Sequence, residues 1–367
     1  MLNNIAMNIC FYISDYGYGH ASRSIAIIRK LLSEHKDVKV FIKNSGAFDY
    51  IGHSLPAENI EVIKTDNDIG VIFRDNSVIV DREQTRKILI DWISSWDNFI
   101  EMEKLFCESH RIDLIISDIT PQAFVVANEL DIPCIAISNF TWHYIFHHLF
   151  GNIPAVERIK DAYMRADLAL VLPFNEDMNV FRKQRKVGLV SREITKDKYE
   201  MRRIMGVSDS EMLVYIGVGR SVDPSFLCNM KNLDIPDLKL LVQSNVELPF
   251  ENVIRIPDDG TETQNYINMC DLAVTKTGYS TASEAIRAKV PMFLLKREGF
   301  REDELIGGAI EGMGIGKFIS ERSFMDGEWI HEMRDLDAYI MNFDNMDDRF
   351  KSDGTKEIIH AIEEMMS

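Results

Sequence analysis

Residues 274–285, with the sequence VTKTGYSTASEA, have the pattern of a strand, a tight polar turn and a helix. Residues 271–274 form a short apolar run typical of a strand, Gly278 marks the turn, and Ser280 or Thr281 is expected to cap the following helix. Such a turn directs free backbone N–H groups and the positive end of a helix dipole at one point, which suits a phosphate. A single glycine turn is a weak signal, so an ordinary strand–turn–helix without a ligand is the alternative.

Other side chains near this turn could complete a nucleotide site. Lys276 precedes the turn and could add a positive charge, while the hydroxyl groups of Ser280 and Thr281 could donate hydrogen bonds. Glu284 lies one helical turn inside the expected helix, where its carboxylate could reach the diol of a ribose. The stretch therefore indicates a phosphate-bearing ligand on local evidence.

A second glycine turn lies near the start of the chain. Residues 7–13 are expected to form the first strand, which leads into residues 15–23, DYGYGHASR, and then into a helix. The pattern resembles a dinucleotide fingerprint, but the third glycine is missing and His20 and Arg23 occupy the turn. A glycine turn that ends in histidine and arginine suits something other than a bare pyrophosphate.

Length and composition exclude several classes of protein. A chain of 367 residues predicts two domains, each with its own core. The net charge is −17, from 41 basic and 58 acidic residues, and this disfavours binding to nucleic acid or to anionic lipid. No apolar run has the roughly 18–20 residues of a membrane helix, and the start lacks a signal-peptide pattern. Five scattered cysteines without a CxxC pair favour reduced thiols and a cytoplasmic location.

Strand-like and helix-like segments alternate along the whole chain, which predicts α/β architecture with parallel sheets. We expect two doubly wound Rossmann-like domains that face a central cleft. They comprise residues 1–186 and 187–350, with a C-terminal helix in 351–367 that could pack on either domain. The linker is expected near residues 187–192, with Arg192 as an ordinary solvated charge. Strands are expected at 38–42, 59–63, 113–118, 133–137, 212–216, 238–242, 253–256 and 290–295, with long helices near 85–109, 302–313 and 356–366.

The expected strand at 113–118 ends in Asp118, at the edge where ligands bind in open α/β sheets. Asp118 could bond the backbone of its own turn or contact a ligand. The aromatic residues 138–148 could wall an acceptor pocket, touch a membrane surface or pack in the core, and the negative charge weighs against the membrane. His143 and His147 have a metal-ligand spacing, but no third ligand stands at a recognisable offset, so no metal site is predicted.

Six motifs together resemble those of GT-B-fold glycosyltransferases of the family 28 type. The chain is most similar to the glycosyltransferase-like N-terminal half of plant L-arabinokinase and its stand-alone microbial relatives. The motifs follow the same order over nearly the whole chain, which is far more specific than any one of them. They are residues 17–23, 117–121, 138–142, 187–192, 276–285 and 291–302.

The resemblance implies that the C-terminal domain binds a nucleotide-sugar donor, with a UDP-type donor expected. It implies that the turn around Gly278 holds the diphosphate, that Glu284 bonds the ribose, that the backbone near Ile256 meets the base, and that Glu302 and Asp303 lie near the sugar. The other donor-side residues implied are Gly217, Gly219, Arg220, Lys276, Tyr279, Ser280 and Thr281.

On the N-terminal domain, the resemblance makes His20 the candidate general base that deprotonates an acceptor hydroxyl. A structural alternative is that its imidazole caps the turn or fixes Arg23. The other acceptor-side or cleft residues implied are Gly17, Gly19, Arg23, Asp118, Asn139 and Trp142. No metal and no cofactor are required, because helix N-termini and side chains such as Lys276 or Arg220 can stabilise the leaving diphosphate.

Two departures from the family patterns concern substrate choice. His143 stands where the arabinokinase-like pattern places an acid, and Glu302 with Asp303 replaces the acid–glutamine pair of family 28. The identities of donor sugar and acceptor are therefore not carried over. The expected function is an inverting, metal-independent glycosyltransferase with an unknown acceptor. The alternatives are a nucleotide-sugar hydrolase or epimerase on the same fold, and a non-catalytic sugar-nucleotide-binding protein.

Overall fold

The computed structural model describes residues 7–56, 58–74, 79–217, 224–257 and 260–366. The chain divides into two compact units, and each contains one parallel sheet. The first unit comprises Met1–Ile72, Asp81–Val190 and Ser352–Ser367, and the second comprises Phe73–Val80 and Ser191–Lys351.

The sheet of the first unit has seven strands in the order β3-β2-β1-β4-β5-β6-β7, and every neighbouring pair is parallel. From β1 the chain builds outward through β2 and β3, and it then returns to place β4 on the other side of β1. This reversal creates a topological switch point between β1 and β4, where ligands bind in open sheets. The strands are β1 Met7–Ile13, β2 Val38–Lys43, β3 Ile60–Ile63, β4 Leu114–Asp118, β5 Cys134–Ser138, β6 Leu168–Val171 and β7 Gln184–Lys186.

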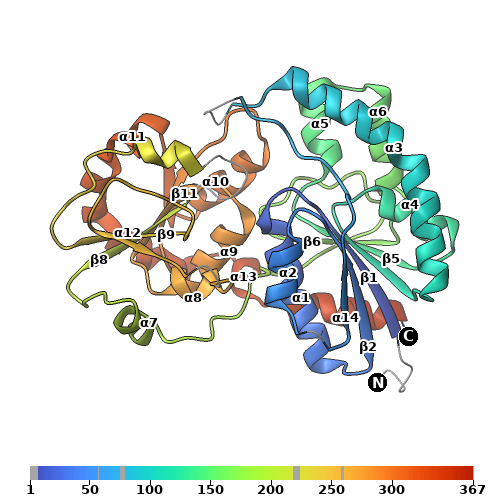
Figure 1. Cartoon of the computed structure of the whole chain (residues 1–367), viewed down its shortest axis with the longest axis horizontal. Helices are drawn as coiled ribbons and strands as arrows, with labels where there is room; N and C mark the ends of the chain where they lie inside the picture. The colour runs from blue at the N-terminus through green and yellow to red at the C-terminus, as the bar shows by residue number, and fades with distance from the viewer. Residues whose placement is uncertain (1–6, 57, 75–78, 218–223, 258–259, 367) are drawn as a thin grey trace. The chain divides into compact units, whose positions relative to one another are not determined.

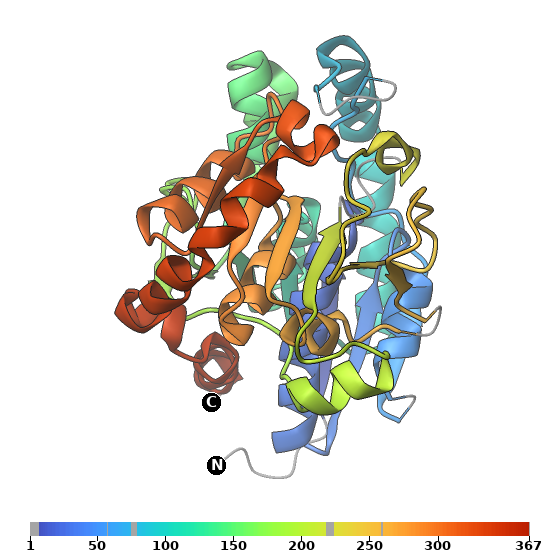
Figure 2. The ribbon, with the colours of Figure 1, turned by 90° about the vertical axis from the view of Figure 1, so that its left-hand side faces the viewer.

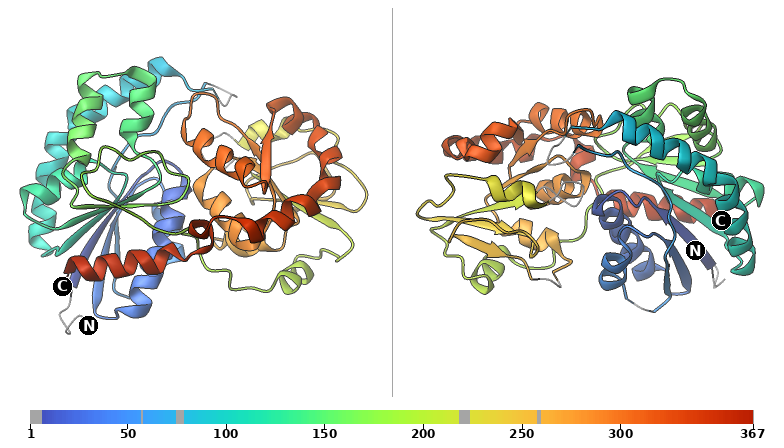
Figure 3. Two further views of the ribbon diagram at one scale, coloured as in Figure 1. Left: turned by 180° about the vertical axis from the view of Figure 1, so that it is seen from behind. Right: turned by 45° about the horizontal axis from the view of Figure 1, so that its top comes forward.

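Helices cover both faces of this sheet (Figures 1 and 3). One layer contains α1 (Tyr18–Glu34), α2 (Phe48–Ser54) and the C-terminal helix α14 (Gly354–Met366), which packs on α1. The position of this last helix, which the sequence left open, is therefore on the first unit. The other helices are α3 Arg82–Ser109, α4 Gln122–Glu129, α5 Trp142–Phe150 and α6 Pro154–Tyr163.

The second unit repeats the same plan with six parallel strands in the order β10-β9-β8-β11-β12-β13 (Figure 2). Its switch point lies between β8 and β11. The strands are β8 Met212–Gly217, β9 Leu238–Val242, β10 Val253–Arg255, β11 Leu272–Lys276, β12 Met292–Leu295 and β13 Gly316–Ile319. The α-helices are α7 Lys198–Ile204, α8 Thr263–Asn268, α9 Tyr279–Ala288, α10 Glu302–Gly312, α11 Glu321–Asp326, α12 Leu336–Asn342 and α13 Asp348–Lys351.

The core of the second unit shows why these strands form. Val214, Leu240, Val274 and Phe293 come from four different strands and are fully buried together with Trp329. Strands that are covered on both faces have continuous apolar sequences, as these do. Burial of apolar surface at roughly 25 cal/mol per Å² then stabilises the parallel order.

The predicted α/β class with two doubly wound parallel sheets is confirmed. The expected arrangement of the domains around a cleft stays a prediction. The prediction that Ser280 or Thr281 caps α9 is wrong, because Gly278 occupies the N-cap and both hydroxyl residues lie in the first turn. The strands β6, β7 and β13 were not predicted. The edge strand β7 has the hydrophilic sequence Gln-Arg-Lys, and none of its residues is buried.

The chain leaves the first unit after Val190 and returns to it at Ser352. The two segments meet at a pair of glycines, Gly188 and Gly354. Leu189 forms an isolated β-bridge with Asp353, and the N–H of Gly354 donates to the carbonyl of Leu189 at 3.1 Å. A Cβ atom added to Gly354 would overlap the backbone carbonyl of Gly188. This close approach of backbones requires residues without side chains.

We expect Gly354→Ala to lower the free energy of unfolding by about 1–3 kcal/mol, because the new methyl group meets backbone that cannot move aside cheaply. Urea unfolding followed by circular dichroism measures the effect. The control is Gly308→Ala in α10, where an added Cβ meets nothing within 4 Å. That change should be neutral or stabilising by up to about 1 kcal/mol. Equal effects of the two substitutions would contradict the proposed contact.

Candidate functional site

A buried pair of side chains stands at the switch point of the first sheet. His20 lies in the first turn of α1, directly after β1, and Asp118 is the last residue of β4. Their side chains meet at 2.8 Å between His20 Nδ1 and Asp118 Oδ1, and the two residues are only 5% and 3% exposed. The switch point therefore brings together a potential base and a carboxylate from neighbouring strands.

Arg23, one turn further along α1, fixes the carboxylate of Asp118. Its Nε donates to Oδ2 at 2.6 Å and its Nη2 donates to Oδ1 at 2.5 Å, while its Nη1 donates to Asn139 Oδ1 at 2.7 Å. Burial alone would raise the pKa of Asp118, but Arg23 and then His20 outweigh it and lower the pKa to about 2. Asp118 is therefore charged at any physiological pH. The side chain of Asp118 pairs with His20 and Arg23 rather than with the backbone of its own turn, and its contact with a ligand stays a prediction.

The position of the His20 proton follows from this charge. Nδ1 is 2.8 Å from both Asp118 Oδ1 and Arg23 Nη2, and it cannot donate to the first while accepting from the second. A lone pair on Nδ1 would face a full negative charge, so we assign the proton to Nδ1 and the hydrogen bond to Asp118. This tautomer leaves a lone pair on Nε2, and Nε2 has no hydrogen-bond partner in the part of the chain that the structure describes.

Backbone strain accompanies the carboxylate. Ile119, immediately after Asp118, has φ of 58°, which is a genuine outlier for a β-branched residue. Its carbonyl accepts a hydrogen bond from the Tyr163 hydroxyl at 2.6 Å, and this contact helps to hold the turn. Strained residues of this kind persist where the surrounding structure over-determines them, often beside functional groups. Here the strained turn ends β4 directly at the carboxylate.

The turn between β11 and α9 has the features expected of an anion site. Gly278 caps α9 without a side-chain hydrogen bond, and the first turn contains no acidic residue. The Nζ atom of Lys276 lies 3.5 Å from where a Cβ of Gly278 would be. It has no ion pair or hydrogen bond among the described residues. Burial and the nearby Arg297 lower the pKa of Lys276 to about 7, as expected for a cation that lacks a counterion.

Glu284 of α9 is buried against Arg192, which corrects the expectation that Arg192 is a solvated charge. The Nε and Nη2 atoms of Arg192 donate to Glu284 Oε1 at 3.0 and 2.7 Å, and Nη2 also donates to Thr263 Oγ1 at 2.8 Å. Burial raises the pKa of Glu284, and Arg192 opposes that shift. The pair fixes the side chain that the sequence assigned to a ribose.

Asp303 does not present a free oxygen to a ligand. It is fully buried, and its two oxygens accept bonds from the backbone N–H, Nε and Nη2 of Arg297 at 2.5–3.1 Å. Arg297 in turn donates to the carbonyl of Thr277 at 3.0 Å, in the turn before α9. Asp303 therefore positions Arg297. Glu302, whose side chain is 10% exposed, lies 3.5 Å from the same guanidinium, and its place near a donor sugar stays a prediction.

The remaining predicted residues differ in their burial and in the contacts that they already make. Arg23, Asn139 and Trp142 are essentially fully buried, so they support the site rather than line it. The backbone N–H of Ile256 already donates to Val242 at 2.9 Å. Gly219 and Arg220 lie outside the described residues. Gly217 and Tyr279 are buried, whereas Gly17, Gly19, Ser280 and Thr281 are half-buried.

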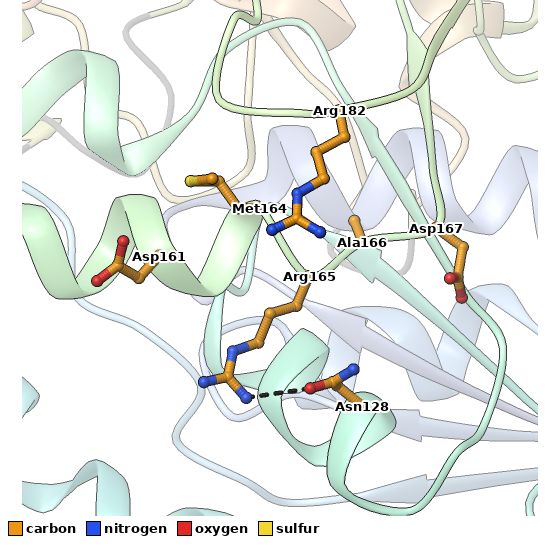
Figure 4. A pocket seen from close by; sticks show the side chains of 7 residues that line it. All are labelled: Asn128, Asp161, Met164, Arg165, Ala166, Asp167 and Arg182. Atoms are coloured by element: carbon orange, nitrogen blue, oxygen red, sulfur yellow. Dashed lines mark hydrogen bonds between the residues drawn. The ribbon is translucent and has the colours of Figure 1, made fainter.

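The structure also contains a surface depression of about 600 Å³ at the amino end of β6 (Figure 4). Arg165 donates to Asn128 Oδ1 at 3.2 Å, and Asp167 accepts from the backbone of Cys134. Two arginines and two aspartates line it together, so their charges balance. It lies at the opposite edge of the sheet from the carboxyl ends of the strands, and we assign no chemistry to it. Its lining is Asn128, Asp161, Met164, Arg165, Ala166, Asp167 and Arg182.

The aromatic helix α5 contributes no metal centre. Trp142 and Phe146 pack in the core, and the rings of His143 and His147 stack at 5.4 Å. Nowhere in the described ranges do three or more histidine, cysteine, aspartate or glutamate side chains group to hold a metal ion. None of the described helices combines the length and apolar character needed to cross a membrane.

Comparisons with known proteins identify the fold. Residues 7–174 match the family model described as Glycosyl transferase family 1. The fold is that of the GT-B glycosyltransferases. The crystal structure of the kitacinnamycin glycotransferase superposes with a TM-score of 0.69 at 15% identity, covering 98% of this chain and 99% of that one. A UDP-glucose: anthocyanidin 3-O-glucosyltransferase solved with UDP gives a TM-score of 0.68 at 12% identity, with 99% of each chain covered.

Sequence similarity extends to L-arabinokinase of Arabidopsis thaliana. The two are 27% identical over 330 residues, which cover 87% of this chain but only 31% of the plant protein. The expected similarity to L-arabinokinase is thus confirmed for less than a third of that protein's length. The matching family model is family 1, so similarity to family 28 in particular stays a prediction.

Sequence reasoning missed two members of these clusters. Arg297 lies within the motif 291–302, six residues before Asp303, and this spacing allows the arginine to pair with that aspartate. Asp68 was not singled out, yet it accepts from Trp142 Nε1 at 2.7 Å. No sequence signal links Asp68 to Trp142, because the two residues lie 74 positions apart.

We expect Asp118→Asn to lower the free energy of unfolding by about 3–5 kcal/mol at neutral pH, because it leaves the buried Arg23 without its counterion. A folded-state pKa below the unfolded value means that this carboxylate stabilises the fold above about pH 4, and that the contribution disappears as pH falls toward about 2. Urea unfolding at several pH values measures both effects.

The matched control is Asp97→Asn, which removes a carboxylate from an exposed pair with Arg158. That change should cost no more than about 1 kcal/mol. A similarly small cost for Asp118→Asn would show that the buried pair does not stabilise the fold.

Proposed function

We propose that this protein is a glycosyltransferase that moves a sugar from a nucleotide-sugar donor to an acceptor hydroxyl. The observation that carries the proposal is the hydrogen bond between His20 Nδ1 and the charged Asp118, which leaves Nε2 free to act as a base. A structural histidine would be expected to use both ring nitrogens within the fold, and His20 Nε2 has no partner among the described residues. The similarity of fold to glycosyltransferases supports the same conclusion.

His20 Nε2 would take the proton of an acceptor hydroxyl as its oxygen attacks the anomeric carbon of the donor. The carboxylate of Asp118 would stabilise the imidazolium that forms and keep the ring in the right tautomer. The bond from the anomeric carbon to the diphosphate oxygen breaks, and the nucleoside diphosphate leaves with that electron pair. A single displacement of this kind inverts the configuration of the anomeric carbon.

The second unit would hold the donor. The N-terminus of α9 and Lys276, which has no counterion among the described residues, would offer positive charge to the diphosphate. Glu284 would accept hydrogen bonds from the ribose hydroxyls through Oε2, because Arg192 donates to Oε1. Glu302 would contact the sugar. We propose a UDP-type donor, supported by the fold similarity to a glucosyltransferase solved with UDP. These groups would stabilise the leaving group without a metal ion.

A thermal-shift panel of UDP, GDP, dTDP, ADP and their sugar conjugates identifies the donor, because a ligand that binds only the folded state raises the melting temperature. Measured release of the nucleotide without any acceptor would instead favour the hydrolase. No shift with any nucleotide would reject the donor site.

With the donor in hand, we expect His20→Gln to reduce turnover by about 10²–10⁴-fold while donor affinity stays unchanged, because the base acts only on the acceptor. Steady-state rates and isothermal titration calorimetry measure the two quantities. His53→Gln, which changes an exposed histidine in α2, is the control and should alter neither. Loss of donor affinity in His20→Gln would remove His20 from the role of base.

We also expect the affinity for the nucleotide sugar to fall as pH rises above about 7, by up to about tenfold per pH unit. Lys276, with its lowered pKa, is charged below that pH in the free protein, and the diphosphate needs the charged form. A nucleotide sugar is the right probe because the terminal phosphate of a free nucleoside diphosphate titrates near pKa 6.

Calorimetric titrations across this pH range compare the wild type with Lys276→Met, whose affinity should be weaker and independent of pH. Lys231→Met, at a lysine that is 69% exposed in the same unit, should keep the wild-type profile. A pH profile unchanged by Lys276→Met would reject the contact between Lys276 and the diphosphate.

A further inference from the structure

The loop of residues 296–301 joins β12 to α10 and leads directly into Glu302, the residue proposed to contact the donor sugar. Its buried anchor is Arg297, which pairs with Asp303 in α10. The same guanidinium donates to the carbonyl of Thr277 at 3.0 Å, in the turn before α9. One side of the loop is therefore attached to the turn that is proposed to hold the diphosphate.

Electrostatic interactions place Glu302 close to the same turn. Burial and then Arg297 lower the pKa of Lys276 to about 7, and the nearby carboxylates of Asp303 and Glu302 oppose that shift. Glu302 Oε2 also lies 3.5 Å from Arg297 Nη2. Because Glu302 is the first residue of α10, its position relative to this turn depends on the conformation of the loop that precedes it.

The other side of the loop is held by a segment from a distant part of the sequence. Ile79 forms a parallel β-bridge with Glu298, and the N–H of Val80 donates to the carbonyl of Glu298 at 3.2 Å. The side chain of Val80 is buried and lies against Gly299, where an added Cβ would be 3.4 Å from Val80 Cβ. Gly299 has φ of 86°, a conformation that favours glycine. The loop thus bends where Val80 meets it.

The segment that contains Val80 is ordered by bonds of its own. Phe73 and Val80 form an antiparallel bridge. The N–H of Asp81 donates to the carbonyl of Ile72 at 2.7 Å, and the N–H of Ile72 donates to Thr85 Oγ1 at 3.0 Å. Thr85 lies in the first turn of α3 and is fully buried. Because these bonds already fix the backbone of the segment, Val80 can hold the loop at a small cost in conformational entropy.

We propose that Val80 is a positioning residue for the donor sugar, because it fixes the loop that places Glu302. Its N–H holds the carbonyl of Glu298, and its side chain packs on Gly299. This inference rests on the proposed function, since it takes Glu302 as a contact of the sugar. No sequence motif of the chain includes Val80, and it touches neither the diphosphate turn nor Glu302 in the contacts described above.

The proposal separates the two parts of the donor. Arg297 attaches the loop to the carbonyl of Thr277 whether or not Val80 is in place, so the diphosphate turn keeps its support. Glu302 has no such support from Val80's side of the loop once the bond to Glu298 is lost. Loss of this bond should therefore weaken contacts with the sugar and leave contacts with the nucleotide unchanged.

The first measurement needs no ligand. Hydrogen–deuterium exchange of the full chain, followed by mass spectrometry, compares residues 296–303 in the wild type and in Val80→Pro. Proline removes the N–H that Glu298 accepts, so we expect exchange in this stretch to become at least about tenfold faster. Exchange in β8, at the centre of the same sheet, should not change. The conservative variant Val80→Ile keeps the N–H and the packing, and should restore the wild-type rate to within about threefold.

The second measurement is calorimetric titration with UDP and UDP-glucose as probes. We expect Val80→Pro to weaken binding of UDP-glucose by at least about tenfold and to leave binding of UDP within about twofold of the wild type. Val80→Ile should restore the affinity for UDP-glucose. A role of Val80 in global stability alone would not separate the two probes, because both bind the same folded protein.

Unchanged exchange of residues 296–303 in Val80→Pro would overturn the proposal, and so would an equal loss of affinity for UDP and UDP-glucose. If Val80→Pro does not fold, Val80→Gly replaces it, because glycine frees the backbone of the segment and removes the packing on the loop. Exchange should then be at least about threefold faster. A wild type that binds neither probe would instead reject the proposed UDP-type donor, and the exchange comparison would still decide whether Val80 holds the loop.

Discussion

The buried contact between Arg23 and Asp118 is the constraint on which the first unit depends. Two charges that leave water cost several kcal/mol each unless their partners are nearly complete. Here the guanidinium spans both carboxylate oxygens and also reaches Asn139, so three segments that follow three different strands are held at one point. The orientation of the His20 ring is a consequence of this arrangement, because the same carboxylate accepts from Nδ1.

The second unit also contains buried carboxylates that are held by arginines. Arg192 holds Glu284 within α9, and Arg297 holds Asp303 and donates to the carbonyl of Thr277 in the turn before α9. The glycine turns before α1 and α9 differ in what precedes the helix. Before α1, the N–H groups of residues 14–17 donate to oxygen atoms of the protein itself, whereas Lys276 before α9 has no counterion among the described residues.

Much of this could be predicted from the sequence, because apolar runs that alternate with helical patterns leave few alternatives to a parallel sheet. The strands that pair in the centre of each sheet were placed within a residue or two, since they are covered on both faces and strongly apolar. The hydrophilic edge strand β7 gave no such signal. Residue roles were harder to predict. In the sequence, Arg192 and Asp303 look like ordinary surface charges. Arg192 is buried because it pairs with Glu284, 92 positions away, and Asp303 is buried because the folded second unit encloses it.

The division of the chain into units has a consequence for how the protein can be taken apart. Because the second unit includes Phe73–Val80 as well as Ser191–Lys351, the polypeptide passes from one unit to the other four times. At the end of the short segment, the N–H of Val80 donates a hydrogen bond to the carbonyl of Glu298 at 3.2 Å. No single cut in the backbone would release either half as a continuous piece. A gene split at any one position would yield fragments that must find each other, as the parts of a complemented enzyme do.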